Sequence, residues 1–339
     1  MPIEPDGSVS VRVPANVAFV ISVLDKDGRR LFPPHRNWLQ LRPGETRTCN
    51  GCPQAAAAGA VDQSHGRDGT SVSAWAGAPA TGVPFAGTVA TYSPNLAETM
   101  AQTRARTSCK AGSVCSQLLS VNPTYDDVWT DAVAAARAPD ASFSYAYNAP
   151  VPTGLTTLAP TTPGCQTTWS SICRIVINYV QHIHPLWSAP RINGAVDNTC
   201  TSCHSPVDVL NANAPRVPAG QLDLSDGDSQ DEPLQKSAYR ELLFADNEQE
   251  LNGGVLLDRL ATTIDPDTGL PVQSPVTVTA SMAATNARNS RFFRKFADGS
   301  GTVDHRAFLT PAELRLLSEW VDIGAQYFNN PFDPAVPLN

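Results

Sequence analysis

Two cysteines and a histidine lie within five residues of one another in the stretch DNTCTSCHSP, residues 197–206. Cys200 and Cys203 are separated by two residues, and His204 follows directly. This is the spacing at which two thiols add to the two vinyl groups of a haem while the next imidazole reaches its iron. The sequence therefore predicts a haem c on Cys200 and Cys203, with His204 as the proximal iron ligand.

Two other chemistries use cysteine pairs of this spacing. A structural zinc site needs a second ligand pair at knuckle spacing, and the other CxxC of this chain, Cys49 and Cys52, lies in a distant segment. A redox dithiol at the start of a helix would leave His204 unexplained. The haem interpretation accounts for all three residues.

A second axial ligand must come from elsewhere in the chain. His305 comes first among the candidates because it lies shortly before the helix cap at Thr310, where small cytochromes present their ligand. Met282 is the alternative, and its thioether would raise the reduction potential. His182 and His184, just before the motif, are the remaining candidates, each of which could equally be a surface histidine or a propionate partner.

The other cysteines form closely spaced pairs. Cys109/Cys115 and Cys165/Cys173 have spacings that suit no common metal knuckle, and each pair would close a short loop as a disulfide. Disulfides indicate an oxidising compartment. We therefore expect an exported protein, periplasmic or extracellular, whose leader is absent from this sequence.

Composition limits the partners. The 339 residues carry a formal net charge of −8, with no basic run and no apolar stretch long enough to span a membrane, so we expect neither a nucleic-acid partner nor a membrane span. We expect a redox partner protein, and a homo-oligomer is possible. The 29 prolines indicate long ordered loops.

The elements that must position the motif are read from periodicity. Residues 8–14, 17–25 and 37–45 read as strands, and 142–148 as another. Helices are predicted at 125–137 and 234–244, and the segment 175–184 reads as a strand leading into a helix that Pro185 ends. The clearest helix lies within 309–328 and has about 18 residues: Thr310 is its N-cap, Pro311 its first residue, and Glu313 completes a capping box.

These elements predict a loop-rich α+β fold. A small β-sandwich-like unit at 1–50 is followed by a loop-rich connecting region at 51–164, which starts at the first CxxC. A mainly helical haem domain follows at 165–339.

Two resemblances extend this interpretation. INYVQHIHPLW, before the motif, and LSEWVDIGAQY, with Gly324 and Ala325, resemble the two crossing helices of a class I cytochrome c domain, over residues 175–329. The order NWLQLRPGETRTCNGC, HIHPLW, CTSCH and LTPAELRLLSEWVDIGAQYF resembles the middle and C-terminal parts of hydrazine synthase alpha-subunit-like proteins, over 8–335. That resemblance implies a preceding β-propeller, two c-type haems, and two histidines on the C-terminal iron.

The first CxxC departs from the family pattern, because Pro53 stands where the resemblance implies a histidine. Three interpretations remain open: a disulfide between Cys49 and Cys52, a second haem with His35 or His65 as its ligand, or a metal site that uses the two thiols. The resemblance alone does not imply hydrazine synthesis by this chain.

The predicted function is electron transfer through covalent haem c. Two strong axial ligands would close the iron to substrates. One alternative is a haem enzyme of the hydrazine-synthase-like or peroxidase-like kind with an open iron position. Another is a haem-bearing structural subunit of an extracellular cytochrome assembly.

Overall fold

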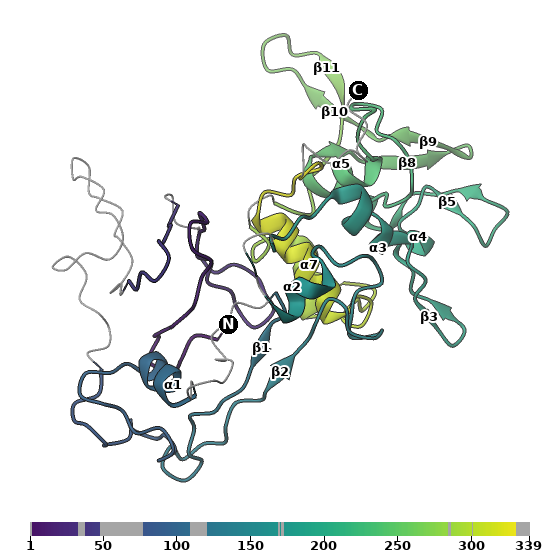
Figure 1. Cartoon of the computed structure of the whole chain (residues 1–339). Coiled ribbons are helices and arrows are strands. Elements are labelled where there is room, and N and C mark those ends of the chain that lie inside the picture. Colours follow the sequence, from purple (N-terminus) through teal and green to yellow (C-terminus); the bar gives the residue numbers. More distant parts are fainter. Residues whose placement is uncertain are drawn as a thin grey trace. The chain divides into compact units, whose positions relative to one another are not determined.

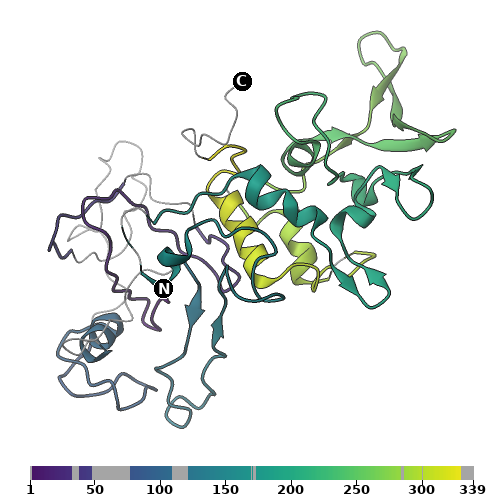
Figure 2. The ribbon, with the colours of Figure 1, turned by 45° about the vertical axis from the view of Figure 1, so that its right-hand side comes forward.

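The structure is a computed structural model, and it describes residues 2–32, 38–47, 77–108, 121–168, 170, 173–283, 286–299 and 301–329. The chain divides into two compact units (Figure 1, Figure 2). The first comprises Met1–Val20, His35–Tyr145 and Pro163–Cys173, and the second Ile21–Pro34, Ala146–Thr162 and Arg174–Asn339. Each is described by itself.

The first unit has little regular structure and a small aromatic core. It contains α1 (Met100–Ser108), the paired strands β1 (Thr124–Tyr125) and β2 (Phe143–Ser144), and α2 (Pro163–Thr167). Trp129 packs edge-on against Phe85, with ring centres 5.9 Å apart, and its Nε1 donates to the Glu4 carboxylate at 2.6 Å. A hydrogen-bonded carboxylate in the core fixes the ring more precisely than packing alone.

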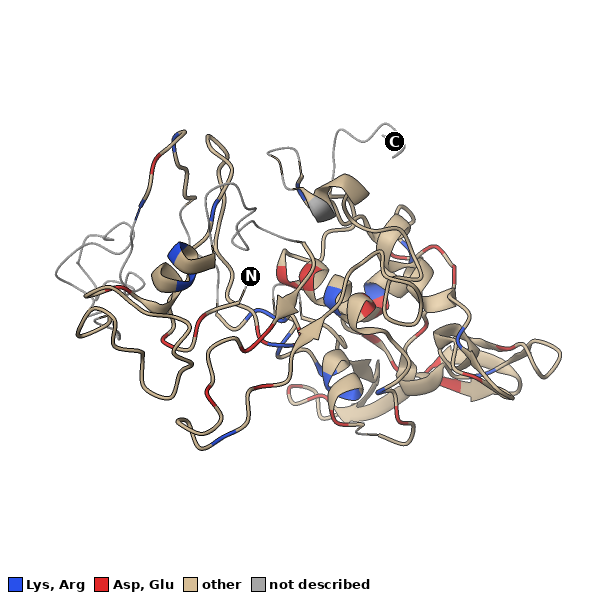
Figure 3. Ribbon diagram, turned by 60° about the horizontal axis from the view of Figure 1, so that its bottom comes forward, with Lys and Arg blue, Asp and Glu red and all other residues tan. Residues whose placement is uncertain are grey.

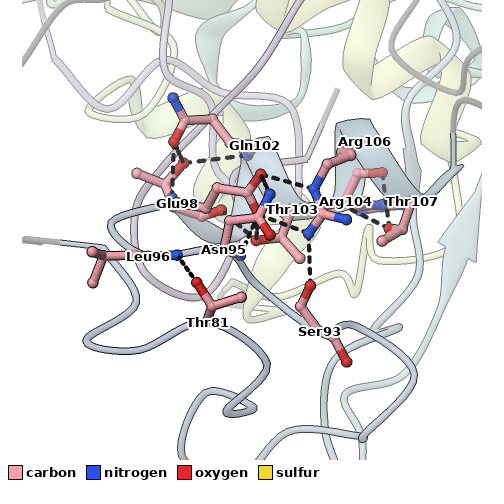
Figure 4. Close-up of polar contacts among 11 residues, drawn as sticks. Thr81, Ser93, Asn95, Leu96, Glu98, Gln102, Thr103, Arg104, Arg106 and Thr107 are labelled. Carbon is pink, nitrogen blue, oxygen red and sulfur yellow. Dashed lines mark hydrogen bonds and ion pairs between the residues drawn. The ribbon is translucent and has the colours of Figure 1, made fainter.

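A polar network orders the chain that enters α1 (Figure 4). Arg106 donates to both oxygens of Glu98 at 2.8 Å, and also to the Ser93 carbonyl at 2.6 Å. Glu98 in turn accepts the backbone N–H of Asn95 at 2.8 Å. The side-chain hydrogen bond from Arg106 is the main reason why the pKa of Glu98 falls to about 2.

The predicted disulfide between Cys165 and Cys173 is confirmed, with Cα atoms 5.4 Å apart. Cys109 and Cys115 lie outside the described residues. The predicted strand at 142–148 is present as the short strand β2.

The predicted helix at 125–137 is wrong, because Asp127 and Asp131 bond to the local backbone instead. Asp127 accepts the N–H groups of Trp129 and Thr130, and Asp131 accepts those of the residues two and three positions ahead. Such side-chain bonds compete with helix formation and favour turns.

The predicted β-sandwich-like unit at 1–50 is also wrong. Its described residues form isolated bridges and no strand, and among these bridges are Phe19 with Leu39 and Leu24 with Arg30. A sandwich needs two sheets with their apolar faces buried against each other. Here Ile21 is 45% exposed and Trp38 69% exposed, so alternation along the segment did not signal a buried face.

The second unit places short helices and two-stranded sheets around one core. Its first elements along the chain are η1 (Tyr179–Ile183, a π-helical turn), α3 (Pro185–Ser188), β3 (Ile192–Asn193), β4 (Val196–Asp197), α4 (Cys200–Cys203), β5 (Val207–Asp208), β6 (Ala214–Pro215) and η2 (Ala219–Gln221). Then follow α5 (Ser237–Leu243), β7 (Asp246–Asn247), β8 (Gln249–Asn252), β9 (Val255–Asp258), β10 (Leu260–Ile264), β11 (Pro271–Pro275), β12 (Thr277–Val278), α6 (Arg291–Ala297) and α7 (Pro311–Asp322).

The second unit is not mainly helical, so that part of the predicted fold class is wrong. Helix makes up 20% and strand 16% of the structure, and each sheet among the described residues has two antiparallel strands. The segment between α5 and α6 folds into hairpins: Gly253 and Gly254, with φ of 60° and 83°, make the tight turn between β8 and β9. No helix in the described ranges is long and apolar enough to cross a membrane.

Helix α7 confirms the predicted start of the terminal helix but not its length. The Thr310 hydroxyl accepts the Glu313 N–H at 3.2 Å, and Glu313 accepts the Thr310 N–H at 2.7 Å. The helix has 12 residues because the chain reverses at Gly324 and Ala325, whose φ values are 116° and 50°.

The core of the second unit is aromatic. Trp320 of α7 is fully buried, with its ring centre 5.5 Å from that of Tyr179 in η1. Tyr179 lies 5.0 Å from Tyr239 of α5 and 5.4 Å from Tyr327 by the same measure. The segment before the motif, α5 and the terminal segment therefore share one core, which holds the elements flanking α4.

Candidate functional site

The two cysteines of the motif lie on the single helical turn α4. Cys200 is half-buried and Cys203 exposed, and both are free thiols. Asp197 orders the turn by accepting the Thr199 N–H at 2.9 Å and the Ser202 hydroxyl at 2.5 Å. At the other end, Arg216 donates to the Ser202 carbonyl at 2.5 Å and to that of Ser205 at 3.1 Å. The turn is thus fixed at both ends, and neither of its thiols is in a disulfide.

A buried ion pair connects this turn to α7. Arg191 donates to both carboxylate oxygens of Glu313, at 2.9 and 3.1 Å, and their side chains are 9% and 0% exposed. The Arg191 backbone N–H donates to the Thr199 hydroxyl at 3.0 Å, and Thr199 directly precedes Cys200. Burial raises the pKa of the Cys200 thiol, and the neighbouring Arg191 opposes this effect.

His204 is held in one tautomer. Its Nδ1 lies 3.3 Å from the Leu222 carbonyl oxygen, which can only accept, so Nδ1 carries a proton in this contact. Burial is the main cause that lowers the pKa of His204, and this favours the neutral imidazole that binds metals.

His305 lies beside His204. The two ring centres are 6.4 Å apart, with an angle of 44° between the planes. His305 also has its Nδ1 on a backbone carbonyl, that of Val303 at 2.9 Å, which leaves Nε2 as the free acceptor. Phe296 and Phe308 flank the His305 ring at 5.9 and 5.0 Å between ring centres. Both histidines therefore direct Nδ1 at a backbone carbonyl, and two phenylalanine rings flank His305.

The separation of these rings fits a shared metal. An iron between two imidazole nitrogens at roughly 2 Å each, with each nitrogen about 1.1 Å from its ring centre, would place the centres about 6 Å apart. With two free thiols beside His204, the residues present fit a haem c. No group of three or more His, Cys, Asp or Glu side chains suited to a metal ion occurs in the described ranges.

The other predicted axial ligands lie in different surroundings. Met282 is 2% exposed, and its N–H donates to the Leu242 carbonyl of α5 at 2.8 Å. His182 is buried in η1, where its Nδ1 accepts the Asn178 N–H at 3.0 Å. The structure places neither in a recorded contact with His204.

His184 belongs to a separate charged group. Its Nε2 lies 3.3 Å from Asp226, which also pairs with Lys236 at 2.9 Å. Burial is the main cause that lowers the pKa of His184, although Asp226 acts in the opposite direction. Its ring lies against Tyr179, with centres 5.7 Å apart.

The first CxxC lies outside the described residues. Cys49, Cys52 and Pro53 fall there, as do His35 and His65, so the three interpretations of that segment stay predictions.

Three contributors to the site were not predicted from the motifs in the sequence. Arg191 and Glu313 were not paired because 122 positions separate them, although Glu313 was identified for its capping role. Phe296 lies on α6, a segment for which no helix was predicted, and it packs against His305. Its signal was the run RFFRKF, in which aromatic residues recur at helical spacing.

Comparison with known proteins gives one match. Residues 1–54 match the family model of the hydrazine synthase alpha subunit middle domain, a segment that includes Cys49 and Cys52. No curated protein and no solved structure matches the chain. The match supports a hydrazine-synthase-like relation for the N-terminal segment; it does not extend to the CTSCH motif or to His305.

Proposed function

We propose that the second unit carries one haem c, bound covalently by Cys200 and Cys203 and ligated by His204 and His305, and that it transfers electrons. The observation that carries this proposal is the juxtaposition of His204 and His305, with ring centres 6.4 Å apart. When bound, the haem supplies an iron that cycles between ferric and ferrous states.

The chain's own residues would hold the group and orient its ligands. Backbone carbonyls at Leu222 and Val303 keep both imidazoles in the Nδ1–H form, so that each presents Nε2. Phe296 and Phe308 pack against the His305 ring, with ring centres 5.9 and 5.0 Å from it. A surround that changes little between oxidation states keeps the reorganisation energy of electron transfer low.

The first test is haem content after maturation in a host with cytochrome c machinery. Pyridine haemochrome absorbance and intact mass should show a covalent haem on the wild-type protein. The variant Cys200→Ser/Cys203→Ser should lose one haem, the one bound by this unit. Cys49→Ser/Cys52→Ser, the matched control, should retain it. A wild-type protein without covalent haem would refute the proposal.

The second test identifies the sixth ligand. His305→Ala should convert a low-spin spectrum into a high-spin one and open the iron to carbon monoxide, whereas Met282→Leu and His182→Gln should leave the spectrum unchanged. If the spectral change follows Met282→Leu instead, the assignment of His305 is wrong.

A haem enzyme with an open iron site is the second candidate. The match of residues 1–54 to the hydrazine synthase alpha subunit middle domain favours it. Carbon monoxide binding to the reduced wild-type protein, without loss of His305 ligation, would favour this candidate and would indicate an iron other than the one proposed here.

The proposed setting is an oxidising compartment, periplasmic or extracellular, with a protein as redox partner. The disulfide between Cys165 and Cys173 supports it, since such bonds persist outside the reducing cytosol.

A further inference from the structure

The second unit contains an acidic arm, which lies between His204 and His305 in the sequence. We define the acidic arm as residues 246–278, from β7 to β12, and Figure 1 shows its two hairpins, β8–β9 and β10–β11. It has one basic residue, Arg259, and six acidic ones, so its formal charge is −5 in a chain of −8: Asp246, Glu248, Glu250, Asp258, Asp265 and Asp267. Arg259 pairs with Glu248 at 2.6 Å, so the other carboxylates set the net charge of the arm. Figure 3 colours the Asp and Glu positions of the ribbon red and those of Lys and Arg blue.

The acidic arm also exposes apolar side chains. Seven of them are at least 45% exposed, among them Leu257 at 49%, Ile264 at 65% and Leu270 at 63%. Single exposed apolar residues are ordinary on protein surfaces, but seven within two adjoining hairpins mark a surface that another molecule covers.

The charges and the apolar side chains are interleaved. Glu250 lies directly opposite Leu257 in the β8–β9 register, so the two share one face of that hairpin. At the tip of β10–β11, Ile264 ends one strand, Asp267 lies in the turn, and Leu270 directly precedes the other strand. A partner that buried the apolar groups would therefore meet carboxylates at the same place.

We propose that the acidic arm is a docking surface for a basic protein, one that presents lysine and arginine side chains around an apolar centre. Opposite charge would steer the encounter over a Debye length, and burial of the apolar groups would hold the complex. A second copy of this chain would bring another charge of −5 against the first, and nucleic acid or an anionic membrane would be repelled in the same way. The proposal does not depend on the haem.

The base of the arm is suited to holding it in place for docking. The Gln221 side chain donates to the Gln249 carbonyl at 2.9 Å and accepts the Gln249 N–H at 2.8 Å. At the outer end of this base, Glu248 N–H donates to the Val276 carbonyl at 2.7 Å, and Arg259 N–H donates to the Glu248 carbonyl at the same distance. These bonds connect the starts of the two hairpins to each other, and they connect the first hairpin to η2.

The test measures binding of a lysine-rich mitochondrial cytochrome c, used as the basic probe, by isothermal titration calorimetry. Affinity should fall at least tenfold between about 20 and 200 mM salt. Glu250→Lys/Asp267→Lys should weaken binding about tenfold at low salt, whereas the control Asp231→Lys/Glu232→Lys, with the same change in charge outside the arm, should weaken it less than about twofold. Leu257→Ser/Ile264→Ser should weaken binding without changing its salt dependence.

Three results would overturn the proposal. Equal losses in the arm variant and the control variant would show that only net charge matters. Absence of binding at low salt would show that the arm does not dock basic proteins. A dimer of the wild-type chain in sedimentation velocity, abolished by Leu257→Ser/Ile264→Ser, would show that a second copy covers the arm. Circular dichroism of each variant verifies that the fold is retained.

Discussion

The ion pair between Arg191 and Glu313 should be among the most sensitive points of the second unit. Glu313 accepts four hydrogen bonds: two from Arg191, one from the Thr310 N–H, and one from the Thr156 hydroxyl at 2.5 Å. Its side chain is 0% exposed. Arg191→Met removes two of these donors and leaves a buried carboxylate without its countercharge, at a cost of about 3 to 5 kcal/mol.

Two further variants separate charge from hydrogen bonding. Glu313→Gln keeps a residue that can complete the capping box but removes the negative charge, so about 2 to 3 kcal/mol is expected from the stranded Arg191. The double variant Arg191→Met/Glu313→Gln should lose clearly less than the sum of the single losses, because no buried charge remains unpaired.

The assay is urea unfolding followed by tryptophan fluorescence and far-UV circular dichroism. Lys26→Met is the matched control, because Lys26 pairs with Asp27 at 2.7 Å in the same unit but is 78% exposed, and its loss should cost less than about 0.5 kcal/mol. A loss below about 1 kcal/mol for Arg191→Met, or additivity of the two single variants, would refute the reasoning.

Three other predictions follow from single contacts. Cys165→Ser should lower the free energy of unfolding by about 2 to 3 kcal/mol through the loss of an eight-residue cross-link, and peptide mass mapping without reductant should find Cys165 joined to Cys173 in the wild type. Thr310→Ala should cost about 1 to 2 kcal/mol in urea unfolding, because the hydroxyl caps α7 and also donates to the Gly154 carbonyl at 2.9 Å. Burial raises the pKa of Glu241 to about 8 from 4.5, so the folded state binds this proton more tightly than the unfolded state; its stabilising effect is complete below about pH 4.5 and disappears as pH rises to about 8. In urea titrations at successive pH values, Glu241→Gln should reduce the fall of the free energy of unfolding between about pH 4.5 and 8. If this pH dependence is the same in the variant and the wild type, Glu241 is not its cause.

Local signals in the sequence predicted some elements well. The Thr310–Glu313 capping box and the short Cys165/Cys173 loop depend on residues close in the chain, and both are present. The hairpin turn at Gly253–Gly254 also has a local signal, since Asn-Gly-Gly between strand-forming residues favours a tight turn.

Long-range partners could not be predicted in the same way. The Arg191–Glu313 pair and the approach of His204 to His305 join residues far apart in sequence, and periodicity does not specify which distant side chains meet. His305 was ranked first among the candidate ligands only from its distance to the next helix. The helix assigned around Asp127 failed because its carboxylate bonds to local N–H groups, which composition does not reveal.

The meeting of His204 and His305 has a mechanical consequence for the chain between them. The two residues are 101 positions apart in sequence, and the segment they bracket contains the acidic arm. Under the proposed ligation, the iron would act as a cross-link that closes this long loop, and restricting the unfolded chain in this way corresponds to about 4 to 5 kcal/mol. Loading the haem would then lower the population of chains in which the segment between the two histidines is unfolded, and the arm would gain resistance to proteolysis.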